Sequence, residues 1–258
     1  MIGMRVDRSR YKELSAGKSV PYCFEIKRDK QVIFYFGANH SHDPKNKQYS
    51  VLRRYWADFL KIKNARKYVV IEGSKRPIRK NDEEAIKSGS EGTLVTLWAH
   101  KKKIPIINPE PSWKTVLSKL MRRFPKDTVQ YYDFAGLIDN WSRYSPRPDF
   151  EKWMTDVMAF YAKENGWKDY ILSHMKLVHK RLFGKRFVLR DPHFFNLLVN
   201  PNRTNTVINR VAQAASDIRD EIILKRLVKE WKAGNSLFIV YGSGHAFLHE
   251  PILKKYLK

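Results

Sequence analysis

Apolar and polar residues follow two different periods along the chain, and the first apolar segments form a pair. The alternating residues 22–27 and the apolar run 31–36 are joined by a charged turn around Asp29, which predicts a β-hairpin. A helix-start signal at 41–44 is followed by apolar residues at helical spacing over 49–60. The pattern therefore predicts two strands and then an amphipathic helix.

Two more short apolar runs follow, with a helical pattern between them. The run 68–71 ends at Glu72 and Gly73, and the run 104–107 ends at a proline-rich bend. The residues between these runs have apolar positions at helical spacing. Alternation of strand and helix predicts an α/β fold with a mostly parallel central sheet and right-handed crossovers.

The middle of the chain is aromatic-rich and helical in pattern, and it separates two parts of the predicted sheet. We expect a first α/β half over 1–111 and an inserted helical cap over 112–200. A long helix over 204–231 and a last strand over 236–241 then complete the α/β domain within 201–258.

Two of the predicted strands end in the same short motif, Gly-x-x-His. One copy is Gly37-Ala38-Asn39-His40 and the other is Gly242-Ser243-Gly244-His245. Glycine after a buried strand indicates a tight turn, because glycine adopts positive φ without strain. Ligands of open α/β sheets bind at the carboxyl ends of the strands, so we expect His40 and His245 to face one crevice.

Glu72 ends a third strand in the same way and adds a carboxylate to the two imidazoles. His40, Glu72 and His245 form a suitable ligand set for a divalent cation such as Mn, Fe, Co or Zn, with positions left open for water and substrate. A cation bound in this way lowers the pKa of water and polarises a carbonyl group. Without a metal, the same three groups could act as an acid/base pair with an orienting carboxylate.

Composition restricts the class of protein. The chain has 258 residues, of which 43% are hydrophobic, enough for a sizeable core. A single cysteine, Cys23, excludes an internal disulfide and a cysteine-rich metal site, and its place in an alternating strand favours a small core residue. A charged N-terminus and the lack of an apolar run of about 20 residues predict a soluble, cytoplasmic protein without membrane insertion.

The net charge is strongly positive. Lys and Arg number 50 against 26 Asp and Glu, a formal charge of +24. Such a charge attracts polyanions, and non-specific association with nucleic acid is expected. The basic clusters are spread through the chain and match no nucleic-acid-binding module, so a solvated basic surface is an equally good interpretation.

Taken together, the motifs resemble the TraB/TIKI-type family, within a wider group that includes the erythromycin esterases and the ChaN haem-binding proteins. The resemblance covers both ends of the chain in the right order and leaves the helical middle unassigned. It is carried by the two Gly-x-x-His motifs, Glu72, Glu91-Gly92, Glu110-Pro111 and Arg219-Asp220.

The resemblance implies an α/β fold of two related halves, with His40, Glu72 and His245 in one site. It also implies that Arg219 steadies Glu72 or a developing oxyanion, and it marks Glu110 as a candidate fourth ligand or general base. The chain departs from the pattern at Ala38-Asn39, where the esterase and ChaN groups commonly have a glutamate after the glycine.

Three functions fit these observations. The first is a divalent-metal-dependent hydrolase of TraB/TIKI type, acting on a peptide, an ester or a related bond. The second is a non-enzymatic protein that binds haem or another anionic ligand, with tyrosine or histidine as axial ligands. The third is a hydrolase of a polyanion such as nucleic acid, which would use the basic surface.

Overall fold

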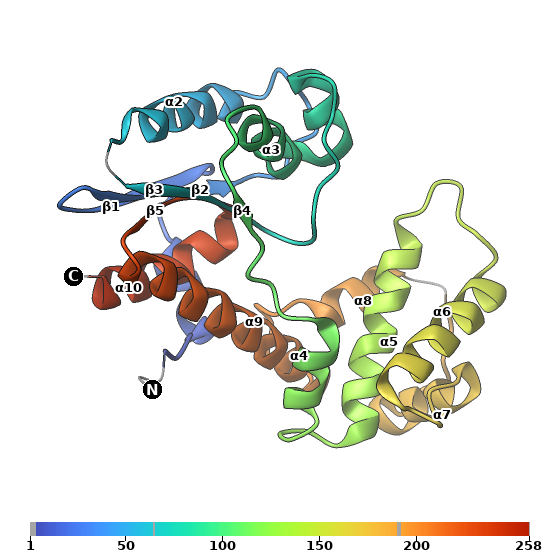
Figure 1. The fold of residues 1–258 in the computed structure, drawn as a ribbon. Helices are drawn as coiled ribbons and strands as arrows, with labels where there is room; N and C mark the ends of the chain where they lie inside the picture. Colours follow the sequence, from blue (N-terminus) through green and yellow to red (C-terminus); the bar gives the residue numbers. More distant parts are fainter. Residues whose placement is uncertain (1–3, 64, 190–191, 258) are drawn as a thin grey trace. The chain divides into compact units, whose positions relative to one another are not determined.

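The computed structural model describes residues 4–63, 65–189 and 192–257, and it divides into two compact units (Figure 1). The first unit is an α/β unit made of Met1–Glu110 and Asp220–Lys258. The second is a helical unit made of Pro111–Arg219. The α/β unit is therefore discontinuous in sequence, because the helical unit is inserted into it.

A five-stranded sheet forms the centre of the α/β unit, in the order β1-β2-β5-β3-β4. Strand β1 pairs antiparallel with β2, and the other neighbours pair in parallel. This mixed, mostly parallel sheet confirms the predicted α/β fold class. The strands are β1 (Tyr22–Arg28), β2 (Gln31–Ala38), β3 (Arg66–Ile71), β4 (Ile106–Ile107) and β5 (Asn235–Gly242).

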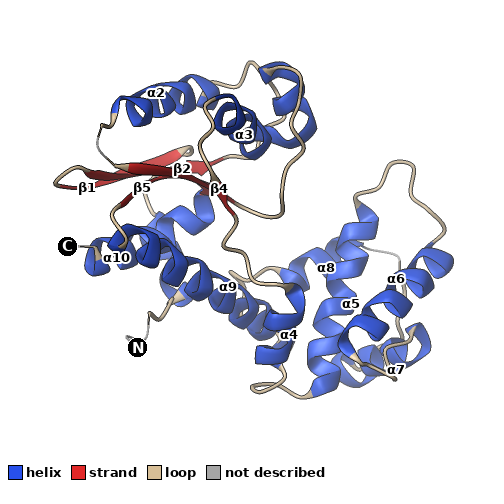
Figure 2. Cartoon of the chain, viewed as in Figure 1, coloured by secondary structure: helices blue, strands red, loops and turns tan. Residues whose placement is uncertain are grey.

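Helices cover both faces of the sheet (Figure 2). Helices α2 (Gln48–Lys61) and α3 (Asp82–Lys101) pack on one face, where Trp56 and Phe59 contact Phe238 of β5. The other face is covered by α10 (Ser243–Tyr256), by the C-terminal part of α9 (Val207–Lys232) and by the N-terminal segment. That segment contains a short 3-10 helix, η1 (Arg8–Arg10), and α1 (Tyr11–Ser15).

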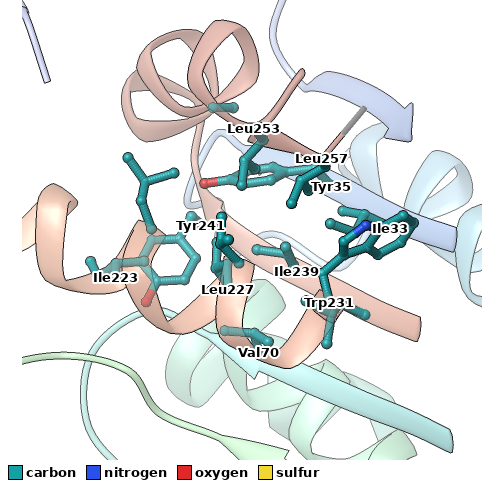
Figure 3. Packing of buried hydrophobic residues seen from close by; sticks show 14 of the residues in the cluster. Ile33, Tyr35, Val70, Ile223, Leu227, Trp231, Ile239, Tyr241, Leu253 and Leu257 are labelled. Carbon is teal, nitrogen blue, oxygen red and sulfur yellow. The ribbon is translucent and has the colours of Figure 1, made fainter. Parts of the chain in front are cut away.

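The sheet has a hydrophobic core on each face, and side chains that alternate along the strands contribute to both. In β5, Leu237, Ile239 and Tyr241 face the α9/α10 side, whereas Phe238 and Val240 face α2 and α3. Figure 3 shows the first of these cores, where Trp231 of α9 packs near Ile239. β5 is buried along its whole length, and because both of its faces are covered, its residues 237–241 form a continuous apolar run.

The helical unit contains the helices α4 to α8 and the first part of α9. Aromatic side chains contribute to its core, among them the buried Tyr131, Phe134 and Phe195. The predicted boundary at 200/201 lies before α9, whereas the structural boundary lies inside it, at Arg219/Asp220. Asn209 explains part of this difference, because its amide donates to the carbonyls of Leu197 and Leu198 and so ties the start of α9 to α8. The helices are α4 (Trp113–Leu120), α5 (Lys126–Ser142), α6 (Phe150–Asn165), α7 (Leu172–Phe183) and α8 (Pro192–Val199).

Two elements differ from the sequence pattern for local reasons. Strand β4 has two residues rather than four, since Pro105 has no N–H to donate and contributes only its carbonyl, to the amide of Val69. Helix α3 is broken at Gly89 and Ser90, and Ser90 has a φ of 53°. Glu91 therefore begins a second helical segment. Among the described residues, no helix is both long and apolar enough to cross a bilayer.

Candidate functional site

The two Gly-x-x-His motifs lie side by side, as their sequence pattern predicts. Strands β2 and β5 are parallel neighbours, and Ala38 is in register with Gly242. His40 follows β2 by two residues, and His245 lies in the first turn of α10. Both histidines approach Glu72, whose backbone amide donates to the carbonyl of Val240 next to them. The site is thus built at the carboxyl ends of β2, β5 and β3.

The motif glycines serve close packing, which corrects the expectation that they adopt positive φ. Gly242 has a φ of −57°, and the residue with positive φ is His40, at 46°. A Cβ on Gly242 would lie 2.6 Å from Nε2 of His40, and a Cβ on Gly37 would lie 2.7 Å from Cβ of Ala246. The missing side chains therefore let the imidazole and the start of α10 approach the strand ends.

His40 is oriented by a carboxylate from α3. Its Nδ1 lies 2.5 Å from Oε1 of Glu91, and a carboxylate can only accept, so Nδ1 carries the proton and Nε2 faces Glu72. The hydrogen bond that His40 donates to Glu91 is the main reason that the pKa of His40 is raised. The second oxygen of Glu91, Oε2, is buried and has no hydrogen-bond partner among the described residues.

His245 is oriented in the same way by Asp220 of α9. Its Nδ1 lies 2.6 Å from Oδ1 of Asp220, which leaves Nε2 at 3.4 Å from Oε1 of Glu72. Burial opposes protonation of His245, but the carboxylates of Asp220 and Glu72 outweigh it and raise its pKa to about 10.

Asp220 is itself held by a buried network. Its Oδ2 pairs with the guanidinium of Arg8, and its Oδ1 also accepts from Nε2 of His249 at 3.1 Å. The other nitrogen of His249 accepts from the hydroxyl of Tyr35 at 2.8 Å. Burial would raise the pKa of Asp220, but the charge of His245 and its hydrogen bonds hold that pKa well below the ordinary value. Asp220 is therefore ionised and fixed.

Glu72 lies between the two imidazoles. Its Oε2 accepts from the backbone N–H of Gly242 at 2.8 Å and lies 3.7 Å from Nε2 of His40. Burial disfavours the charged form of Glu72, yet the hydrogen bond and charge of His245 outweigh it and bring the pKa to about 2. The carboxylate is thus charged over the whole physiological range.

The donor set has the ligand types that divalent cations prefer. A tetrahedral cation with ligand bonds of about 2.1 Å separates its ligand atoms by about 3.4 Å. Oε1 of Glu72 lies 3.4 Å from Nε2 of His245, whereas the other oxygen, Oε2, lies 3.7 Å from Nε2 of His40. Among the described residues, these three side chains do not bring one ligand atom each within 4.8 Å of one another, so a cation would draw the ligands closer together. A histidine that binds a metal normally donates its other ring N–H to a carboxylate or carbonyl, and both His40 and His245 do so.

Another set of possible ligands shares His245. Among the described residues, Asp220, His245 and His249 bring one ligand atom each within 4.8 Å of one another. The atoms of this set already bond to each other, and both Asp220 and His249 are fully buried. We therefore assign Asp220 and His249 to the support of His245.

The remaining predicted residues lie as follows. Glu110 is the last residue of the first segment of the α/β unit, and its N–H donates to Oδ1 of Asn108. Burial is the main cause of the raised pKa of Tyr35, and the charge of Glu110 adds to it. Arg219 belongs to the helical unit, where it lines a pocket with Tyr132. The catalytic roles of Glu110 and Arg219 stay predictions.

Sequence interpretation named Glu91 and Asp220 only as parts of resembling motifs and missed their role as partners of the two histidines, although signals for that role exist. His245 and His249 are four residues apart, so they share one face of α10 and a single carboxylate can bridge them. Glu91 follows Gly89 and Ser90, and such a glycine–serine pair within a helical pattern is typical of a kink. These signals indicate where the histidine partners are placed.

Comparison of the chain with protein-family models, with curated proteins and with solved structures found no match. The geometry of the α/β unit therefore carries the functional argument.

Proposed function

We propose that the α/β unit is a divalent-metal-dependent hydrolase of TraB/TIKI type, acting on a peptide, an ester or a related bond. The observation that carries this proposal is the matched support of two histidines. Nδ1 of His40 and Nδ1 of His245 each donate to a separate buried carboxylate, and both Nε2 atoms face Glu72. This is the arrangement that fixes the tautomer of metal-binding imidazoles.

His40, Glu72 and His245 would hold the cation. When bound, a divalent cation supplies a water of lowered pKa and polarises the carbonyl to be attacked. The chain's own groups provide the orientation. Glu91 and Asp220 fix the two rings, and the N–H of Gly242 fixes Oε2 of Glu72. Side chains fixed before binding keep a site in its productive geometry.

Metal content tests this proposal most directly. The purified protein is dialysed against chelator and titrated with Mn²⁺, Co²⁺ and Zn²⁺ by calorimetry, alongside His40→Asn, Glu72→Gln and His245→Gln. We expect each substitution to weaken binding while the circular dichroism spectrum is unchanged. Asparagine is chosen at position 40 because it tolerates the positive φ of this residue.

His42→Asn is the matched control. His42 is exposed, lies two residues from His40, and its Nδ1 hydrogen bonds to the carbonyl of Lys87. It should bind metal like the unmodified protein. Metal-supplemented protein is then assayed with ester and peptide substrates. If none of these metals binds, the metal-free acid/base or ligand-binding alternative replaces this proposal, and a Soret band in the purified protein would favour haem.

A further inference from the structure

A cavity lies in the α/β unit, apart from His40 and His245. Its volume is about 830 Å³, within the range of pockets that hold small molecules. The buried residues Ile71, Thr96 and Ala99 line it, from β3 and α3. Neither Glu91 nor Asp220, the carboxylates that orient His40 and His245, is among its lining residues.

The cavity exposes apolar side chains that would gain from being covered. Ile78 is 52% exposed and Ile106 is 38% exposed, and both line it. Removing apolar surface from water is favourable in proportion to the area buried. A ligand with an apolar portion would therefore be stabilised here.

The charged groups around the cavity have one sign. Lys75, Arg76 and Lys103 line it, and none of its lining residues is acidic. Lys75 and Lys103 form no ion pair with a carboxylate in the part of the chain that the structure describes. Nε of Arg76 is buried and has no hydrogen-bond partner among those residues. The cavity thus combines an apolar surface with uncompensated positive charge.

We propose that this cavity binds an amphiphilic anion, with its hydrocarbon portion against Ile71, Ala99 and Ile106 and its carboxylate or phosphate near Arg76 and Lys103. The site does not depend on the hydrolase proposal. It is nevertheless linked to Glu72, because Nη2 of Arg76 donates to the backbone carbonyl of Glu72 at 3.2 Å. A bound head group would therefore contact the same guanidinium, that of Arg76, as the segment that carries Glu72.

The probe is decanoate, titrated into the full-length protein by calorimetry below its critical micelle concentration. Decyl phosphate, decan-1-ol and acetate are compared with it. We expect decanoate or decyl phosphate to bind at least tenfold more tightly than decan-1-ol, and acetate not to bind. The tighter of the two anions identifies the head group as carboxylate or phosphate. Equal affinity for decanoate and decan-1-ol would overturn the proposal.

Substitutions assign the site. Lys103→Gln should weaken decanoate several-fold and leave decan-1-ol unchanged, whereas Lys102→Gln removes the same charge outside the cavity and should change neither. Ile106→Ser should weaken both probes, and Phe160→Ser, at a 61% exposed position in the helical unit, should weaken neither.

Circular dichroism and sedimentation accompany each variant. Equal losses from Lys103→Gln and Lys102→Gln would show non-specific attraction and overturn the proposal. It is also overturned if Ile106→Ser converts a dimer to a monomer and decanoate does not bind, because a second copy then covers the cavity. The two proposals are tested separately. If His245→Gln binds no metal but still binds decanoate, the cavity remains assigned, whether or not the hydrolase proposal holds.

Discussion

At the scale of single residues, the site depends on an absent side chain as much as on the charged ones. Gly242 gives Glu72 a backbone N–H and leaves the adjoining space to the imidazole of His40. Any Cβ at this position would occupy space that Nε2 of His40 fills. A substitution at Gly242 therefore tests the site without removing a proposed ligand.

We expect Gly242→Ala to lower divalent-metal affinity by at least about tenfold, the lower end of what loss of an orienting partner costs. The new methyl group would lie 2.6 Å from Nε2 of His40, so the ring must move. Calorimetric titration with Zn²⁺ or Mn²⁺ measures the loss. Gly244→Ala is the matched control, since the nearest atom to its Cβ is 3.6 Å away, and unchanged metal affinity in both variants would contradict the prediction.

Asp133 of the helical unit provides a pH prediction. It is buried and accepts from the indole of Trp113 and the hydroxyl of Tyr170, and burial raises its pKa above 3.8 despite these bonds. The folded state therefore binds this proton more tightly than the unfolded state, so the contribution to stability is present below about pH 3.8 and is lost as the pH rises through the raised pKa.

The difference in free energy of unfolding between the unmodified protein and Asp133→Asn isolates this contribution. As the pH falls toward 3.8, the free energy of unfolding of the unmodified protein should rise relative to that of Asp133→Asn, by up to about 1.4 kcal/mol for each unit of pKa shift. Urea denaturation at several pH values measures it. A difference that is independent of pH would show that Asp133 is not perturbed.

At the scale of elements, the site joins the N-terminal segment to two helices. Arg8 of η1 pairs with Asp220 of α9, and Asp220 holds His245 and His249 of α10. Arg8 and Asp220 are both buried, so their charges depend on each other. Breaking a buried pair by removing one partner costs more than the pair itself contributes, because the other charge is left uncompensated.

We expect Arg8→Met to lower the free energy of unfolding of the α/β unit by about 3–5 kcal/mol. Methionine retains the length and apolar character of the side chain, so the loss reports on the charge. Urea denaturation gives the value. Arg10→Met is the control, because Arg10 forms an exposed pair with Glu13 and its loss should leave stability unchanged. Equal effects of the two substitutions would argue against a buried pair.

At the scale of the whole molecule, the positive charge belongs to both units. Lys and Arg outnumber Asp and Glu in Pro111–Arg219 and in the rest of the chain alike. A steering field accelerates binding to a site when charge is concentrated there. Spread over two units, the excess favours weak association with any polyanion.

Two double substitutions test that interpretation. Lys101→Gln with Lys102→Gln alters the α/β unit, and Arg122→Gln with Arg123→Gln alters the helical unit; all four side chains are exposed. Both should weaken binding to a DNA duplex equally at low salt and reduce the salt dependence equally, because each removes two phosphate contacts at most. A much larger loss from one of them would locate a specific polyanion surface and revive the polyanion hydrolase.

The order of elements and the meeting of His40 with His245 could be predicted from the sequence, because buried strands and terminal glycines leave local patterns. The roles of the histidines' partners could not, because Glu91 and Asp220 are brought to the histidines by packing between distant elements. The family resemblance includes Glu91 and Asp220 but assigns them no role; it gives one to Arg219, whereas Asp220 supports His245. Adjacent helical residues point about 100° apart, and the sequence did not fix that rotation.

The discontinuity of the α/β unit has a consequence for its synthesis on the ribosome. Strand β5 lies between β2 and β3, yet it is made after the entire helical unit. Until it arrives, the nascent chain has two separate strand pairs whose facing edges lack their partner, and unpaired edges promote aggregation. Asp220 and His245 arrive with the same last segment, so no form of the site precedes completion of the sheet.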